Sequence, residues 1–166
     1  MKCSVPDLTH KMPRVLIIGY GNPLLSDDGL GWHAAEYLST ILTCPDIQIL
    51  SCHQLTPELA ETVSQAELVI FIDARRGGEP GTIDCHEIPN RFSMNTSSAQ
   101  RPPSLLHQLS PAAVLALAHD LYGVAPRCYV LSVIGASFEP GSTLSPQVAA
   151  SLPALAAQVQ SLISRK

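Results

Sequence analysis

Carboxylates and imidazoles occupy positions in this 166-residue chain where they could bind a cation together. Asp27 and Asp28 follow a glycine-rich turn, and Asp73 directly follows a run of five apolar residues. His53 follows another apolar run, and His107 precedes an apolar helical pattern. Two carboxylates and a neutral imidazole can hold a divalent metal ion and leave coordination positions open for water or a substrate group. The spacing does not choose between the two histidines, because the candidate ligands come from distant segments.

Each of these side chains also has an ordinary structural interpretation. Asp27 and Asp28 suit the first turn of a capped helix as solvated carboxylates, because a helix N-terminus favours negative charge. For Asp27 this is the interpretation that we favour. Asp73 could instead accept backbone N–H bonds or pair with Arg75 or Arg76. The remaining histidines are expected at the surface or satisfied in the core: His10, His33, His86 and His119.

Other catalytic patterns are incomplete or missing. The turn 19–24 lacks the third glycine of a dinucleotide-binding fingerprint, and the two aspartates after it would repel a pyrophosphate. This counts against one rival function, a nucleotide-dependent oxidoreductase on a similar sheet. The sequence has neither the H-E-x-x-H of a zincin nor the G-x-S-x-G of a nucleophile elbow. Cys52 adjoins His53, but neighbouring strand residues point to opposite faces, so a cysteine nucleophile is disfavoured.

Composition and charge narrow the class of partner. The chain is 46% hydrophobic and 14% charged with a net charge of −4, values typical of one globular domain over residues 1–166. A mildly acidic chain without a lysine or arginine run is not expected to bind nucleic acid or an anionic membrane surface. No apolar run is long enough to span a membrane, and residues 1–13 look like a flexible leader rather than a signal peptide. Five cysteines without a C-x-x-C pair favour reduced thiols and a cytoplasmic protein.

Short apolar runs alternate with helical patterns, and these strands and helices must position the candidate ligand residues. Strands are predicted at 15–19, 47–50, 67–73, 82–88 (with the polar alternation of an edge strand) and 128–134. Helices are predicted from Ser26 to 43, from Thr56 onward, from Ser110 to Tyr122 and from Ser145 to Ser164. Ser26, Thr56 and Ser110 are the expected N-caps, and Pro146 lies in the first turn of the last helix. A long polar surface loop is expected at 89–104.

The order β-α-β-α-β-β-α-β-α predicts a three-layer α/β fold. Its centre is a mostly parallel, twisted sheet of about five strands, with helices on both faces. Ligands of such sheets bind at the carboxyl ends of the strands. Asp28, Asp73 and one of the two candidate histidines should therefore meet at that rim.

The residues at this rim resemble a known family, the hydrogenase maturation endopeptidases. The stretch 19–31, with sequence GYGNPLLSDDGLG, is similar to the family's N-terminal signature. Residues 72–74 with 77–82 look like its second block, and residues 104–109 look like its histidine block. The resemblance covers nearly the whole chain, from about residue 14 to residue 163.

The resemblance implies both a function and a site. Members of this family are proteases that trim the C-terminus of the large subunit of nickel–iron hydrogenases. Their metal-contacting positions match Asp28, Asp73 and His107, so the resemblance selects His107 over His53. It implies a metal-dependent endopeptidase, expected to be a cytoplasmic monomer, whose three residues contact nickel already bound to the precursor, or an equivalent divalent ion. The alternative is a non-enzymatic, nickel-dependent chaperone module that binds the precursor without cutting it.

One segment departs from the family pattern. Many members carry an acidic turn after the second strand, whereas this chain has SCHQLTPEL at 51–59. The stretch resembles the subgroup that serves cytoplasmic, bidirectional, NAD-linked hydrogenases. Because this segment borders the predicted metal rim, we expect His53, Gln54, Thr56 and Glu58 to read the particular precursor.

Overall fold

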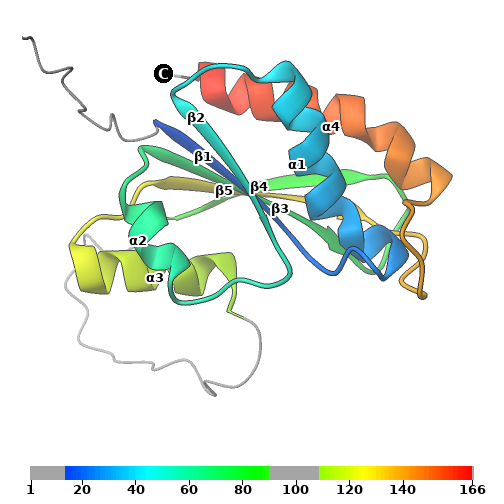
Figure 1. Ribbon diagram of the computed structural model, residues 1–166, viewed down its shortest axis with the longest axis horizontal. Coiled ribbons are helices and arrows are strands. Elements are labelled where there is room, and N and C mark those ends of the chain that lie inside the picture. The colour runs from blue at the N-terminus through cyan, green and yellow to red at the C-terminus, as the bar shows by residue number, and fades with distance from the viewer. Residues whose placement is uncertain (1–13, 90–108, 166) are drawn as a thin grey trace, which may run out of the picture.

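A five-stranded sheet forms the centre of the computed structural model, which describes residues 14–89 and 109–165 (Figure 1). The strand bounds are β1 Val15–Tyr20, β2 Ile47–Cys52, β3 Leu68–Arg75, β4 Ile83–Ile88 and β5 Arg127–Ile134. The strands lie in the order β2-β1-β3-β5-β4. All neighbours pair in parallel except β4, which runs antiparallel to β5 at one edge. The predicted three-layer α/β fold is confirmed, and the segment with polar alternation is an edge strand as expected.

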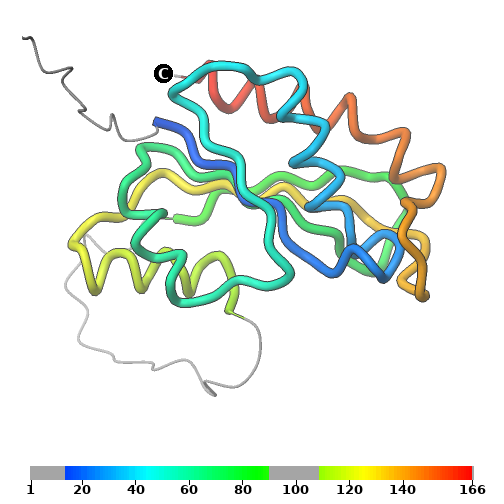
Figure 2. Tube along the Cα trace, viewed as in Figure 1, coloured from blue at the N-terminus to red at the C-terminus, as the bar shows by residue number. Residues whose placement is uncertain are grey.

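Helices cover both faces of this sheet. Their bounds are α1 Leu30–Ile41, α2 Leu59–Ser64, α3 Pro111–Tyr122 and α4 Pro146–Ser164, and a 3-10 helix η1, Ser26–Gly29, precedes α1. α1 and α4 lie on one face, and α2 and α3 lie on the other (Figures 1 and 2). Nowhere in the described ranges is a helix both long enough and apolar enough to cross a membrane. The predicted leader 1–13 and nearly all of the predicted loop 89–104 lie outside the described residues.

Alternation along β1 supplies both apolar cores. Leu16 and Ile18 pack with α2 and α3, whereas Val15 and Ile17 pack with α1 and α4. Leu16, Ile17 and Ile18 are fully buried because helices cover both sides of this central strand. Burying one such side chain stabilises the fold by roughly 1.5–3 kcal/mol. The packing therefore holds the carboxyl end of β1 in a fixed place at the rim.

The first α-helix begins later than the sequence predicts. Ser26 is not its cap: this residue has a φ of 48°, and its hydroxyl donates to the carbonyl oxygen of Glu139 at 2.9 Å. α1 starts at Leu30, with Gly29 as N-cap and no side-chain capping bond. Contacts with the loop 135–145 thus engage Ser26, and the turn that begins there is the 3-10 helix η1 instead of the first turn of α1.

Two other predicted caps have opposite outcomes. The cap at Ser110 is confirmed, because its hydroxyl oxygen accepts a hydrogen bond from the N–H of Ala113 at 3.2 Å, and Gly123 ends the helix with a φ of 71°. The predicted cap at Thr56 is wrong. α2 begins at Leu59, and a turn precedes it in which the carbonyl of Thr56 accepts from the N–H of Leu59 at 3.2 Å.

Candidate functional site

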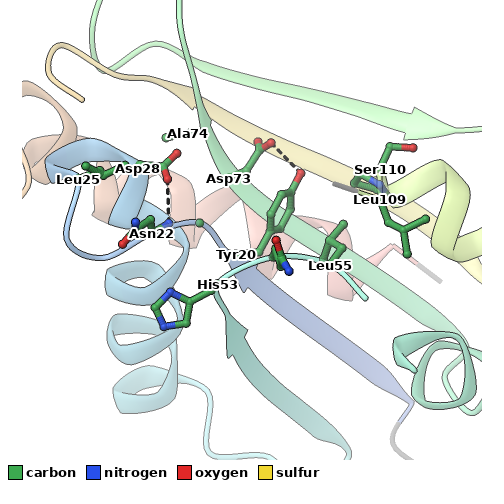
Figure 3. Close-up of a pocket in the computed structure, with 13 residues that line it drawn as sticks. Tyr20, Asn22, Leu25, Asp28, His53, Leu55, Asp73, Ala74, Leu109 and Ser110 are labelled. Atoms are coloured by element: carbon green, nitrogen blue, oxygen red, sulfur yellow. Dashed lines mark hydrogen bonds between the residues drawn. The ribbon is translucent and has the colours of Figure 1, made fainter. Parts of the chain in front are cut away.

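The carboxyl ends of β1, β2 and β3 border a cavity of about 510 Å³ (Figure 3). Side chains from these strand ends, from η1 and from the start of α3 line it. Asp28 and Asp73 are both among them. The structure thus brings together the two carboxylates that the sequence predicts at this rim.

Glycines let η1 and α1 approach the end of β1. A Cβ atom at Gly19 would lie 1.9 Å from the carbonyl oxygen of Gly31, and one at Gly31 would lie 2.2 Å from the backbone nitrogen of Tyr20. Gly21 has a φ of 135°, and a Cβ there would lie 2.0 Å from the carbonyl oxygen of Asp28. A side chain at any of these glycines would push the two segments apart. The glycine-rich signature therefore places Asp28 beside the strand end.

Asp28 is held at the cavity by a backbone group. Its Oδ2 accepts a hydrogen bond from the N–H of Asn22 at 2.8 Å (Figure 3). The side-chain oxygen of Asn22 accepts in turn from the N–H of Leu24 at 3.0 Å, which fixes the turn. Asp28 is half-buried, and its Oδ1 takes no hydrogen bond from the described part of the chain. Among the described residues, therefore, none occupies this second carboxylate oxygen.

Asp73, near the end of β3, is held by hydroxyls from two neighbouring strands. Tyr20 donates to its Oδ2 at 2.7 Å, and Ser132 donates to its Oδ1 at 2.5 Å. Burial raises the pKa of Asp73, and the two hydroxyl bonds oppose that shift without cancelling it. Asp73 is thus a more basic carboxylate than one in open water.

Neither arginine that follows Asp73 forms an ion pair with it, so that structural interpretation is wrong. Arg75 forms an ion pair with Asp84 at 3.1 Å, with about half of each side chain exposed. The guanidinium of Arg76 lies 4.1 Å from the centroid of the Phe138 ring. Within the ranges that the structure describes, the hydrogen-bond partners of Asp73 are the hydroxyls of Tyr20 and Ser132.

Asp27 is not the solvated carboxylate that we expected, since its exposed fraction is 0%. Its two oxygens accept hydrogen bonds from the N–H groups of Ala136 (2.7 Å), Ser137 (2.9 Å) and Ser145 (2.7 Å), and from the hydroxyl of Ser145 (2.8 Å). Burial by itself would raise the pKa of Asp27, but these four bonds together lower it. Its partners lie 109 to 118 residues further along the chain, so no local pattern could reveal this role.

Two of the four predicted recognition residues lie at the cavity. His53 and Gln54 line it, and the ring of His53 meets Trp32 edge-on with the ring centroids 5.2 Å apart. Thr56 and Glu58 stand outside this lining, in the turn that leads into α2. The segment after β2 therefore contributes to the cavity wall and continues away from it over the surface.

The third predicted ligand, His107, lies outside the described residues. Leu109 and Ser110, which follow it closely in the chain, line the cavity. Within 14–89 and 109–165, no three His, Cys, Asp or Glu side chains form a group that could hold a metal ion. The two carboxylates at the cavity suit a divalent ion, because they offer the oxygen donors that such ions bind. They supply two of the three predicted ligands.

Comparisons with known proteins identify relatives similar to this chain in sequence. The hydrogenase 2 maturation protease of Escherichia coli is 30% identical over 149 residues, which cover 86% of each protein. The hydrogenase expression/formation protein HupM of Azotobacter chroococcum is 33% identical over 166 residues, covering 95% of this chain and 76% of HupM. No family model matches the chain.

Solved structures similar to this one are also hydrogenase maturation peptidases. The hydrogenase maturating endopeptidase HybD of Escherichia coli is 26% identical and superposes with a TM-score of 0.70, covering 90% of this chain and 91% of HybD. A hydrogenase 2 maturation peptidase from a Thaumarchaeota archaeon is 25% identical, with a TM-score of 0.69 and coverage of 92% of this chain and 99% of that one.

Proposed function

The chain belongs to the hydrogenase maturation proteases, and from this premise we propose that it removes the C-terminal extension of a nickel–iron hydrogenase large-subunit precursor. The observation that carries the proposal is the cavity at the strand ends, where Asp28 and Asp73 stand together. Two carboxylates at one concave site can bind a cation and accept a proton, which are the two capacities that assisted hydrolysis of a peptide bond needs.

We propose that the substrate is the precursor whose nickel site is already filled. Asp28, Asp73 and His107 would contact that nickel ion, or an equivalent divalent ion. An ion held in this way supplies polarisation of the scissile carbonyl or a lower pKa for a bound water. The nickel then makes the cut selective, because a precursor without it lacks the group that these ligands recognise.

The residues of the chain itself supply position and a base. Asp28 lines the cavity with Oδ1 unbonded to any described residue, while its Oδ2 stays bonded to the backbone. Asp73 has a raised pKa, which makes it the better proton acceptor for an attacking water if nickel serves chiefly to place the scissile bond. Both routes use the same two carboxylates.

The deciding experiment is mass spectrometry of a cognate precursor after incubation with this protein. Nickel-loaded and nickel-free precursors are compared, and an Asp28→Asn variant serves as the matched control for contaminating proteases. Loss of one defined C-terminal peptide from the loaded form alone is the expected result. Cutting of both forms would instead favour a metal carried by the protease, and no cutting of a verified cognate precursor would favour the chaperone module.

We further propose that the segment 51–59 reads the precursor, with His53 and Gln54 at the cavity and Thr56 and Glu58 beyond it. Transplanting this segment into a paralogous protease should transfer the choice of precursor. Unchanged choice in a folded chimera would contradict the idea. The sequence of the segment favours a precursor of the bidirectional, NAD-linked type.

We also propose that the protein acts as a monomer in the cytoplasm, with the precursor as partner and without nucleic acid or membrane. In support of a reducing compartment, the cysteines that the structure describes are all free thiols: Cys44, Cys52, Cys85 and Cys128. The oxidation state of the cysteines in purified protein tests the proposal of free thiols. Sedimentation at working concentration tests the monomeric state.

A further inference from the structure

We propose that Tyr20 is a positioning residue of the cleavage site, which acts together with Ser132 on the carboxylate of Asp73. The inference rests on the proposed function, because it assigns a role in peptide cleavage. It is carried by the two hydroxyl bonds on Asp73, at 2.7 Å from Tyr20 and 2.5 Å from Ser132.

Three neighbouring strands each contribute one member of this cluster. Tyr20 is the last residue of β1, Asp73 lies near the end of β3, and Ser132 stands on β5 in register with Asp73. Each oxygen of a carboxylate has two lone pairs, and the described residues occupy one on each oxygen of Asp73, which leaves a second for a ligand, a water or the substrate. The direction in which Asp73 presents those lone pairs is therefore set by Tyr20 and Ser132.

The packing of the Tyr20 ring does not explain why this side chain carries a hydroxyl. Its ring packs edge-to-face on the buried Phe71, with centroids 6.4 Å apart and an interplanar angle of 83°. A phenylalanine at position 20 would keep that contact. Tyr20 lines the cavity, and its hydroxyl donates to Asp73 (Figure 3). The hydroxyl therefore acts on the carboxylate of Asp73.

Orientation of a reacting group affects rate more than binding. A misplacement of about 1 Å in a reacting group costs on the order of 100-fold in rate. Removal of the Tyr20 hydroxyl frees one oxygen of Asp73 and allows the carboxylate to turn about its remaining bond to Ser132. We therefore expect a loss in kcat, with the half-saturating precursor concentration little changed.

The test compares Tyr20→Phe with Tyr129→Phe. The control also removes a single hydroxyl from the sheet, one that accepts a 2.6 Å hydrogen bond from Arg127 nearer the start of β5 and away from the cavity. Cleavage of nickel-loaded precursor is followed over a range of precursor concentrations, and each variant is melted. Tyr20→Phe should lose roughly 10- to 100-fold in kcat with KM within about twofold, whereas Tyr129→Phe should keep both values.

A second readout does not depend on cleavage. The side-chain carboxyl carbon of Asp73 is observed by ¹³C NMR in the protein without precursor. It should shift or broaden in Tyr20→Phe and stay unchanged in Tyr129→Phe. Because both hydroxyls act on one carboxylate, Ser132→Ala should also reduce kcat less in the Tyr20→Phe background than in the wild type.

Several results would overturn the inference. A folded Tyr20→Phe protein with wild-type kcat removes Tyr20 from the site while leaving the proposed function intact. Parallel loss of rate and melting temperature in both tyrosine variants would make the role purely structural. A wild-type protein that fails to cut the loaded precursor overturns the proposed function and this role in cleavage together.

Discussion

Replacing Asp27 by asparagine should destabilise the fold far more than the same change at an exposed aspartate. In the wild type, Oδ2 of Asp27 accepts from Ala136, Ser137 and the hydroxyl of Ser145, and Oδ1 accepts from the N–H of Ser145. An asparagine that keeps its oxygen at the Oδ2 position retains three bonds without their charge. Its amide group then faces the N–H of Ser145, so that two donors oppose each other in a buried site.

The magnitude follows from these contacts. An unsatisfied buried donor costs about 1–3 kcal/mol, and each of three hydrogen bonds loses about 1 kcal/mol with the charge, giving about 5 kcal/mol in all. For a chain of this size that is a fall in melting temperature of roughly 10–20 °C. The matched control is Asp120→Asn, because Asp120 has 71% of its side chain exposed and should change stability by less than about 0.5 kcal/mol.

The pH dependence of this effect has a definite sign. The pKa of Asp27 is lowered in the folded protein from a usual value of 3.8, so its ionised form stabilises the fold. That stability is fully present above the unfolded pKa and is lost as the pH falls through the folded pKa. The gap in melting temperature between wild type and Asp27→Asn should therefore be constant above about pH 5 and narrow below about pH 4.

The melting temperatures of the wild type, Asp27→Asn and Asp120→Asn are measured by calorimetry or circular dichroism across this pH range. A gap at neutral pH no larger than that of Asp120→Asn would refute the assignment of Asp27 as a buried anchor. A gap that persists undiminished at low pH would refute the assignment of its stability to the ionised carboxylate.

Further predictions concern the candidate site and its scaffold. Asp28→Asn should fold with a near-normal melting temperature and cut the loaded precursor slower by orders of magnitude, and near-normal cleavage by mass spectrometry would remove Asp28 from the site. Gly31→Ala should lower the free energy of unfolding by roughly 1–3 kcal/mol in urea titrations, because its Cβ would lie 2.2 Å from the nitrogen of Tyr20, and a wild-type midpoint would contradict the close approach. NADH and NADPH should leave the melting temperature unchanged, and a saturable rise with either would revive the nucleotide-binding alternative.

The fold was predictable because its signals are local. Short β-branched runs between turn residues identify the central strands, and a serine followed by proline, with glycine at the far end, identifies α3, Pro111–Tyr122, between its caps Ser110 and Gly123. The meeting of Asp28 and Asp73 also follows from topology, since parallel strands carry their end residues to one rim. The predicted His107 stays untested, because it lies outside the described residues.

The parts that could not be predicted depend on contacts between distant segments. Asp27 and Asp28 are neighbours in an acidic pair, yet one is buried under the loop 135–145 and the other faces the cavity. The local pattern places both in the first turn of a helix and predicts no buried anchor at Asp27. The displaced start of α1 has the same origin, because Ser26 bonds to Glu139 in that loop instead of capping the helix.

These contacts divide the rim into a rigid part and a variable part. Asp27 ties η1 to the loop after β5, Tyr20 and Ser132 fix Asp73, and backbone fixes Asp28, so the two candidate carboxylates are held by groups within the protein. The segment 53–58 differs, since most of its side chains are exposed. Cleavage requires fixed geometry, whereas discrimination among precursors requires a surface that can change without disturbing it. Substitutions in the rigid part should therefore alter kcat for every precursor, and substitutions in the segment 53–58 should alter which precursor is cut.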